Sequence, residues 1–196
     1  MEQLALMIGG PAKERVIESC RRGDRESFRL LFETYKDRVY TVALYFFGGD
    51  EQAAADVTQQ VFLKLFTRIA QFRREAEFTT WLYRLTINAC IDERRRGRKF
   101  DPLDEAVAPR TAHGRYAAEE GAERREASEA VREAVASLRP KLRAVVLLKY
   151  FEELSYEEIA EVLGCSKGTV ASRLNRGHKA LARKLGHLRG ALFQGD

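Results

Sequence analysis

A group of hydrogen-bonding and cationic side chains recurs at helical spacing near the carboxyl end of the chain. Its members are Thr169, Ser172, Asn175, Arg176 and Lys179, with Arg183 one turn further on. At about 100° per residue, these side chains fall on one arc of a helix. Hydroxyl, amide and cationic groups on an exposed face suit the base edges of a DNA major groove and the phosphates beside it. The alternative is an ordinary solvated helix surface.

Two helices with a tight turn between them are needed to present that face, and the sequence holds their signals. Ser155 and Glu158 have the spacing of a capping box, which starts the first helix. Gly164 supplies a left-handed residue that ends it, and Ser166 caps the second helix. Apolar residues on the inner arc of the second helix are Val170, Leu174, Leu181, Leu185 and Leu188. This order of signals predicts a DNA-binding helix-turn-helix rather than a plain helical hairpin.

A second group of cations ends a helix expected from Thr79 or Thr80 to about Arg98. Five of six consecutive positions are basic, namely Arg94, Arg95, Arg96, Arg98 and Lys99, and Arg84 lies further up the same helix. Cations at a helix carboxyl end stabilise its dipole, which is one explanation. Their number exceeds that need, so we favour contact with phosphates. Asp92 is expected to pair with Arg95 or Arg96.

The segment from Asp50 to Ala70 divides into an apolar side and a polar side. The apolar side holds Ala54, Val57, Val61, Leu65 and Ile69, with Phe62 and Phe66 at its edge. The polar side holds Gln52, Asp56, Gln59, Gln60 and Thr67, and Leu63 sits among them. Such a stripe can dock a partner helix, but a solvated face with a stray leucine fits equally well.

Composition indicates a helical protein with a polyanionic partner. The 196 residues are 45% hydrophobic and 32% charged, with only 4 prolines, and long alternating β-branched runs are missing. We therefore expect an all-α fold. The net charge is +5, and residues 132–190 hold 12 Lys and Arg against 6 Asp and Glu. This concentration of positive charge in the predicted helix-turn-helix region favours binding to nucleic acid.

The cysteines and histidines do not form a recognisable site. Cys20, Cys90 and Cys165 lie far apart, without the spacing of a zinc site or a disulfide framework, so we expect helix packing rather than redox sensing. Paired carboxylates, a nucleophile motif and a phosphate loop are also missing, which argues against an enzyme or a cofactor. The apolar run from Leu4 to Ile8 is too short for a signal peptide, and no stretch approaches a membrane span. We expect a cytoplasmic protein.

Breaker residues divide the chain into two helical domains. Residues 1–98 form the first, with helices over 12–22, from Asp24 to the Gly48-Gly49 break, over 50–70 and from 79 or 80 to 98. Residues 99–127 are expected to form a flexible linker that is mostly irregular, with any helix placed after Tyr116. Residues 128–190 form the second domain, in which Val145, Val146, Leu148 and Phe151 are core candidates, and 191–196 form a tail.

Four phrases of the sequence together carry a family resemblance. They are GDRESFRLLFETYKDRVYTVA from Gly23, ADVTQQVFLKLF from Ala55, FTTWLYRLTINACIDERRR from Phe78 and LSYEEIAEVLGCSKGTVASRLNRGHKAL from Leu154. In this order, the chain resembles an RNA polymerase sigma factor of the extracytoplasmic-function (ECF) group, the minimal two-domain bacterial type.

The resemblance implies how each domain acts. The first domain would bind core RNA polymerase through Asp56, Gln59, Gln60 and Leu63. It would also capture and open the minus-ten promoter element, with a base flipped into a pocket beside residues 71–77. Candidates for this contact are Phe72, Arg73, Tyr83, Arg84, Asn88, Arg94 and Arg95. In the second domain, the family match implies reading of the minus-thirty-five element by Ser172, Asn175 and Arg176, and Thr169 and Lys179 share their face.

Departures from the family pattern limit what can be transferred. Ala55 and Gln60 stand where acidic residues are common, and Ala171 replaces a frequent Lys or Arg. The promoter sequence therefore does not follow from the resemblance, which also leaves open an anti-sigma factor as a partner. The rival interpretations are a DNA-binding regulator that acts without polymerase and a helical enzyme. The regulator should carry a β/α receiver domain, which the sequence does not suggest.

Overall fold

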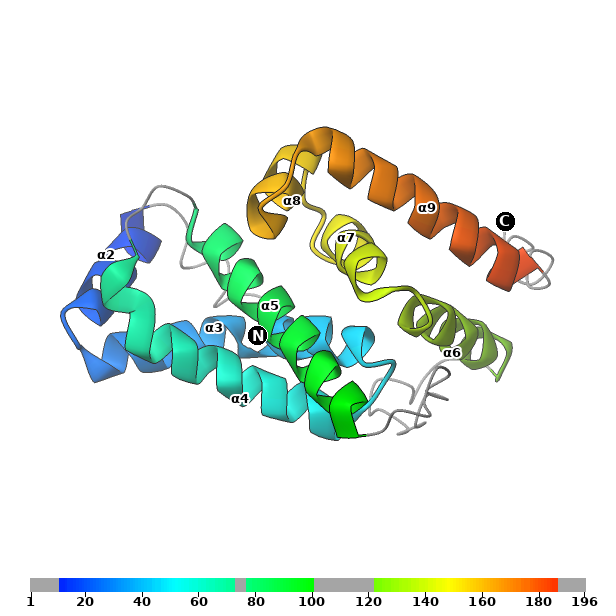
Figure 1. Cartoon of the computed structure of the whole chain (residues 1–196). Coiled ribbons are helices and arrows are strands. Elements are labelled where there is room, and N and C mark those ends of the chain that lie inside the picture. Colours follow the sequence, from blue (N-terminus) through cyan, green and yellow to red (C-terminus); the bar gives the residue numbers. More distant parts are fainter. Residues whose placement is uncertain (1–10, 73–76, 101–121, 187–196) are drawn as a thin grey trace.

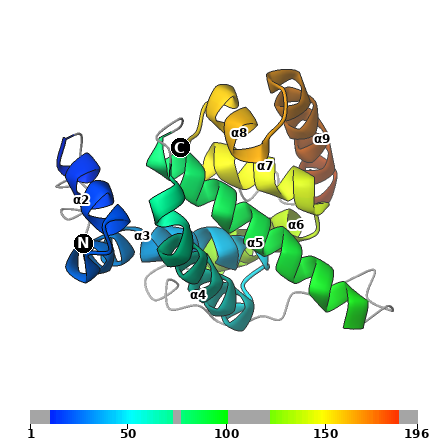
Figure 2. The same ribbon diagram turned by 60° about the vertical axis from the view of Figure 1, so that its left-hand side comes forward.

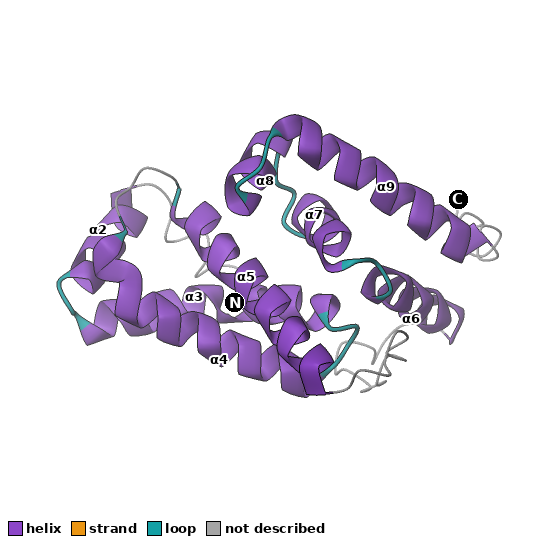
Figure 3. Cartoon of the chain, viewed as in Figure 1, coloured by secondary structure: helices purple, strands orange, loops and turns teal. Residues whose placement is uncertain are grey.

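The computed structural model describes residues 11–72, 77–100 and 122–186 of the chain, and these residues form helices and turns without a strand (Figures 1 and 3). The N-terminal module comprises α2 (Pro11–Arg21), α3 (Arg25–Phe46), α4 (Glu51–Arg68), the short 3-10 helix η1 (Ile69–Gln71) and α5 (Phe78–Phe100). The C-terminal module comprises α6 (Ala122–Ala136), α7 (Pro140–Tyr150), α8 (Tyr156–Leu163) and α9 (Lys167–Leu185). The predicted all-α class is confirmed.

Local signals start and end the N-terminal helices as the sequence predicts. The Asp24 side chain accepts from the Ser27 amide to cap α3, and Asp50 accepts from the Ala53 amide to cap α4. Gly48 and Gly49, at φ 70° and 96°, make the turn between the two helices. Such φ values favour glycine because a side chain is strained there. The turn folds α4 back along α3, which places their apolar sides in contact.

The apolar side predicted for α4 forms the centre of the N-terminal module. Ala54, Val57, Val61 and Leu65 are fully buried, and Ile69 is 3% exposed. They pack with α3 and α5, whose buried residues include Leu31, Val39, Leu82 and Ile87. This burial fixes which side of α4 faces outward, and the polar side with Leu63 is left at the surface.

The helix-turn-helix of the C-terminal module follows the predicted caps. Ser155 and Glu158 form the reciprocal capping box of α8, Gly164 ends the helix at φ 60°, and Ser166 caps α9. Val170 and Leu174 are buried in the core. A Cβ on Gly177 would lie 3.1 Å from Cγ2 of Val146, so glycine permits the close approach of α9 to α7.

The structure differs from the sequence-based expectations in three places. Helix α5 begins at Phe78 rather than Thr79 or Thr80, and α6 begins at Ala122, six residues before residue 128, where the second domain was expected to begin. Phe151, predicted as a core residue of the second domain, is 37% exposed, and its ring packs on Tyr45 of α3 with centroids 4.2 Å apart. The pattern within one segment could not reveal that this ring meets another module.

The two modules lie against each other. Helices α6 and α7 contact α3, and α8 contacts α5, while α9 lies on the outer side of the C-terminal module (Figures 1 and 2). Arg143 of α7 is fully buried at this junction. The C-terminal module therefore covers part of the surface of α3 and α5.

Candidate nucleic-acid and partner interfaces

The outer face of α9 presents the predicted DNA-reading residues to solvent. Ser172, Asn175, Arg176 and Lys179 are exposed, and Thr169 is half-buried at the first turn. The Thr169 amide donates to the Ser166 hydroxyl, so the helix start is fixed by its cap. Arg176 donates from Nη2 to the Ser172 hydroxyl at 3.3 Å, which holds the two groups together on the surface. The structure thus brings this set together on one exposed helix.

Exposed ionic contacts border the start of α9. Lys167 Nζ donates to Glu157 Oε1 of α8 at 2.6 Å, and this hydrogen bond holds the pKa of the Glu157 carboxyl below its ordinary value. Next to Lys179, the His178 ring forms a hydrogen bond of 2.8 Å with the Tyr150 hydroxyl of α7. These contacts orient α9 on α7 and α8 but leave the predicted reading residues uncovered.

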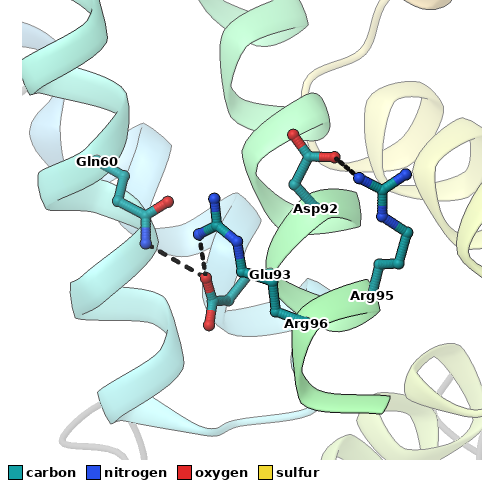
Figure 4. Close-up of polar contacts among 5 residues, drawn as sticks. All are labelled: Gln60, Asp92, Glu93, Arg95 and Arg96. Carbon is teal, nitrogen blue, oxygen red and sulfur yellow. Dashed lines mark hydrogen bonds and ion pairs between the residues drawn. The ribbon is translucent and has the colours of Figure 1, made fainter. Parts of the chain in front are cut away.

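Carboxylate side chains lie among the arginines at the C-terminal end of α5 (Figure 4). Asp92 lies 3.8 Å from Arg95, which confirms the predicted pair, and Glu93 accepts from Arg96 at 3.2 Å. Glu93 also accepts from the side-chain amide of Gln60 in α4 at 3.3 Å. Arg95 and Arg96 are exposed and Arg94 is half-buried. A phosphate approaching this end would compete with weak surface ion pairs rather than with buried ones.

The residues implied for minus-ten contact differ in how far their side chains are exposed to solvent. Phe72 is 6% exposed and packs with Phe78 and Trp81, whose ring centroids lie 5.8 and 5.3 Å from its own. Asn88 is exposed on α5. Arg73 lies outside the described residues. Phe72 as placed supports the core of the module and offers little surface for stacking a base.

Tyr83 and Arg84 meet the C-terminal module. The Tyr83 hydroxyl donates to the carboxylate of Glu152, in the loop between α7 and α8, and Arg84 donates to the backbone carbonyl of Glu161 in α8. Glu152 is also 3.7 Å from Arg38 of α3. Burial raises the pKa of the Glu152 carboxyl, against the opposing effects of the Tyr83 hydrogen bond and the Arg38 charge. Burial and the nearby Glu152 charge likewise raise the pKa of the Tyr83 hydroxyl.

A groove of about 540 Å³ runs between α3 and α4 beside the residues implied for polymerase binding. Gln59 and Leu63 line it, and Leu63 is 59% exposed. Asp56 is exposed on the same side of α4 and accepts from Gln52 at 3.1 Å. Gln60 is half-buried and points toward α5, where it bonds Glu93. Of the residues implied for polymerase binding, Gln59 and Leu63 therefore line the groove and Asp56 lies beside it, whereas Gln60 faces α5.

The aromatic side chains that line this groove were not predicted from the sequence to form part of a binding surface. Phe66 is 53% exposed and meets Phe28 of α3 edge-on, with ring centroids 5.0 Å apart. Phe32 and Phe62 form a similar pair at 4.7 Å. The sequence held one signal, because Phe66 follows Leu63 by three residues and must share its part of the helix surface. The partners on α3 could not be known before the packing of the two helices.

No group of three or more His, Cys, Asp or Glu side chains in ranges 11–72, 77–100 and 122–186 could hold a metal ion. Within the same ranges, no helix is both long and apolar enough to cross a membrane.

Comparisons with known families cover both modules. Residues 31–100 match the family described as "Sigma-70 region 2", and residues 128–181 match "Sigma-70, region 4". The first match spans most of α3 through α5, which holds the aromatic groove and the basic helix end. The second match spans the helix-turn-helix.

Curated relatives match over nearly the full length of the chain. The ECF RNA polymerase sigma factor SigW of Bacillus subtilis is 32% identical, and the alignment covers 86% of this chain and 94% of the relative. The RNA polymerase sigma-H factor of Pseudomonas aeruginosa is 34% identical over 91% and 96%. The ECF RNA polymerase sigma-E factor of Escherichia coli is 33% identical over 87% and 92%.

Two solved structures share the fold. CnrH, determined in complex with the cytosolic domain of CnrY, has a TM-score of 0.65 at 22% identity and covers 88% of this chain and 96% of its own. RpoE of Bartonella quintana, determined with the anti-sigma factor NepR, has a TM-score of 0.67 at 20% identity over 82% and 98%.

Proposed function

Because the chain belongs to the extracytoplasmic-function sigma factors of RNA polymerase, we propose that it binds core polymerase and directs it to specific promoters. The N-terminal module holds the polymerase and melts the minus-ten element, and the C-terminal module reads the minus-thirty-five element. The polymerase performs the chemistry, and this chain acts as a non-enzymatic factor in the cytoplasm, where its DNA and polymerase partners are.

The observation that carries this proposal is the outward face of α9. Ser172, Asn175 and Arg176 are exposed side by side on the second helix of a helix-turn-helix. A guanidinium can bond guanine in two places and an asparagine amide can bond adenine in the same manner, so this face has the groups that direct reading of bases requires. Flanking cations contribute the sequence-independent attraction to phosphates.

We propose that a helix of the polymerase binds in the aromatic groove between α3 and α4. Leu63 and Phe66 are large apolar side chains at the surface, at 59% and 53% exposure, and both line the groove from α4. Exposed apolar side chains that line a groove between two helices suit the apolar face of a third helix. Asp56 and Gln59 supply polar contacts along its rim.

Run-off transcription with purified core polymerase tests the proposal directly. Core enzyme with this chain should yield transcripts of defined length from a pool of candidate promoters, and core enzyme alone should not. Co-purification of the chain with core enzyme is measured in parallel. Binding to polymerase without any start-site preference, or preference for DNA sites without any binding to polymerase, would exclude the proposed function. The second outcome would favour a regulator that acts alone.

The relatives with solved structures suggest one further partner. The solved complexes of CnrH and of Bartonella RpoE each contain a second protein, which in the latter case is an anti-sigma factor. We propose that an anti-sigma factor can also control this chain. Capture from the source cell with the full chain as bait, followed by inhibition of the run-off reaction by the captured protein, would test this.

A further inference from the structure

One carboxylate joins α4 to the basic end of α5. Glu93 Oε2 accepts from the side-chain amide of Gln60 in α4 at 3.3 Å and from Arg96 Nη1 at 3.2 Å, so donors from two helices meet on the same oxygen (Figure 4). Gln60 and Glu93 are 33 residues apart in the chain. This contact links the helix that lines the aromatic groove to the helix that ends in arginines.

The core of the N-terminal module sets the backbone positions of Gln60 and Glu93. Val57 and Val61, each within one turn of Gln60, and Cys90, one turn before Glu93, are fully buried, and α4 packs on α5. Gln60 and Glu93 are themselves half-buried at the edge of this packing. Their side chains therefore have little freedom, and the Gln60 amide is directed to α5.

Arg96 keeps free hydrogen-bond donors while Glu93 holds it. A guanidinium has more N–H donors than the contact with Glu93 uses, and the Arg96 side chain is 61% exposed. An arginine that is restrained in advance loses less conformational entropy when it contacts an anion. Arg95, by contrast, lies 3.8 Å from Asp92 on a side of α5 that faces away from α4 (Figure 4). Arg96 is therefore the arginine of this pair that α4 can position.

The contact requires a hydrogen-bond donor at position 60, which the Gln60 amide supplies. A carboxylate at this position would have no N–H to donate and would face the Glu93 carboxylate at close range, where like charges repel. Exchange of the two groups should preserve the contact. An amide at position 93 could donate to a carboxylate at position 60 and still accept from Arg96.

We propose that Arg96 is a further phosphate contact of the N-terminal module and that Gln60 and Glu93 are its positioning residues. The inference rests on the proposed function only for DNA as the anionic partner. It gives Gln60 a role within the chain, through Glu93, in place of the direct polymerase contact that the family resemblance implies. The contact between α4 and α5 thus sets the orientation in which the basic helix end meets the DNA backbone.

DNA affinity is measured by fluorescence anisotropy with the full chain and a short labelled duplex of randomised sequence, over a series of salt concentrations. All chains carry Arg176→Ala, which reduces the contribution of α9, and this form is the parent chain. Arg96→Ala should lower the slope of log affinity against log salt by about 1, because one phosphate contact is lost. Gln60→Glu should weaken binding at least threefold.

Charge-matched pairs of changes separate positioning from net charge. Gln60→Glu combined with Glu93→Gln has the net charge of the parent chain and should regain its affinity. Gln60→Glu combined with Asp92→Asn has the same net charge, but the carboxylate that it removes lies away from α4, so its affinity should stay low. Gln60→Glu should cost little further affinity beside Arg96→Ala and should still cost at least threefold beside Arg95→Ala.

The proposal is overturned if Asp92→Asn restores binding as well as Glu93→Gln does, because the effect would then be one of net charge. It is also overturned if Gln60→Glu costs as much affinity with Arg96→Ala as without it. Co-purification with core polymerase is scored in the same variants, and a loss that Glu93→Gln does not restore would place Gln60 on the polymerase. Failure of run-off transcription by the unaltered chain would reject the proposed function and leave the duplex measurements readable.

Discussion

The Arg143 guanidinium on α7 donates to the backbone carbonyl of Phe46, the last residue of α3, and lies over the Phe46 ring. Its other nitrogens donate to the carbonyls of Val135 and Leu138 at 3.1 and 3.0 Å, at the end of α6. One buried cation thus satisfies carbonyls of two helix ends, one in each module. Because helix ends leave carbonyls unpaired, this side chain couples the fold of the C-terminal module to its docking on the other.

Arg143→Leu should destabilise the chain. The change leaves three buried carbonyls without their donor, and a buried polar group without a partner costs about 1–3 kcal/mol. We expect a loss of roughly 3 kcal/mol in the free energy of unfolding, measured by urea titration. Arg139→Leu, four residues earlier and exposed, is the control and should change stability little. Equal losses for the two variants would contradict the role given to Arg143.

Arg176→Ala should lower promoter-dependent transcription and leave polymerase binding nearly unchanged. A bidentate base contact contributes about 1–3 kcal/mol of discrimination, so the transcript yield at limiting factor should fall at least fivefold. Run-off assays and co-purification with core enzyme measure the two effects. Lys184→Ala removes the same charge at the last turn of α9 and is the control. A parallel loss of polymerase binding in Arg176→Ala would count against separate roles for the modules.

Leu63→Asp should weaken binding to core polymerase. The leucine is 59% exposed at the aromatic groove, and a carboxylate there would have to be desolvated against the apolar face of a partner helix. We expect at least a tenfold loss of affinity in a fluorescence titration with core enzyme. Ala70→Asp adds the same charge at an exposed position just after α4 and should bind normally. Normal co-purification of Leu63→Asp would reject the groove as the polymerase site.

Acid should favour docking of the two modules on each other. Burial at the docked junction raises the pKa of Glu152 above its ordinary value of 4.5, whereas separated modules would leave this carboxyl in water. The docked arrangement therefore binds a proton more readily, and its population should rise as the pH falls through the raised pKa toward 4.5. Energy transfer between dyes on exposed residues of the two modules, followed as the pH is lowered from neutral, measures this change.

Glu152→Gln is the control for the pH experiment. The amide can still accept the Tyr83 hydrogen bond but has no charge to titrate, so energy transfer in this variant should stay flat across the same range. Burial raises the pKa of the Tyr83 hydroxyl above its ordinary value, so Glu152 is the member of this hydrogen-bonded pair that changes its charge over this range. An unchanged pH response in Glu152→Gln would assign the effect to other carboxylates.

Much of the helical framework was predictable because its signals are local. Asp24, Asp50, Ser155 and Ser166 cap the helices as their spacing predicts, and Gly164 ends α8 in the left-handed region. The period of the apolar residues in α4 also identified its buried side. Each of these signals acts within one or two helical turns, so no knowledge of the remaining chain was needed.

The candidate sites were predictable only in part. The exposed face of α9 followed from helical period, since the apolar arc with Val170 and Leu174 had to be buried. The aromatic groove did not, because Phe66 meets Phe28 only after α4 folds back on α3. The burial of Phe72 and the role of Phe151 at the junction were missed for the same reason.

Most of the helices, their buried faces and the family of both modules could be predicted from the order of residues along the chain. The contacts of Glu152 with Tyr83, 69 residues earlier, and of Arg143 with Phe46, 97 residues earlier, became visible only in the folded chain. This is because caps and amphipathic period depend on neighbours a few residues away, whereas contact between modules depends on the complementarity of two folded surfaces. A carboxylate in a loop gives no local sign that a phenol and a guanidinium from other helices will enclose it.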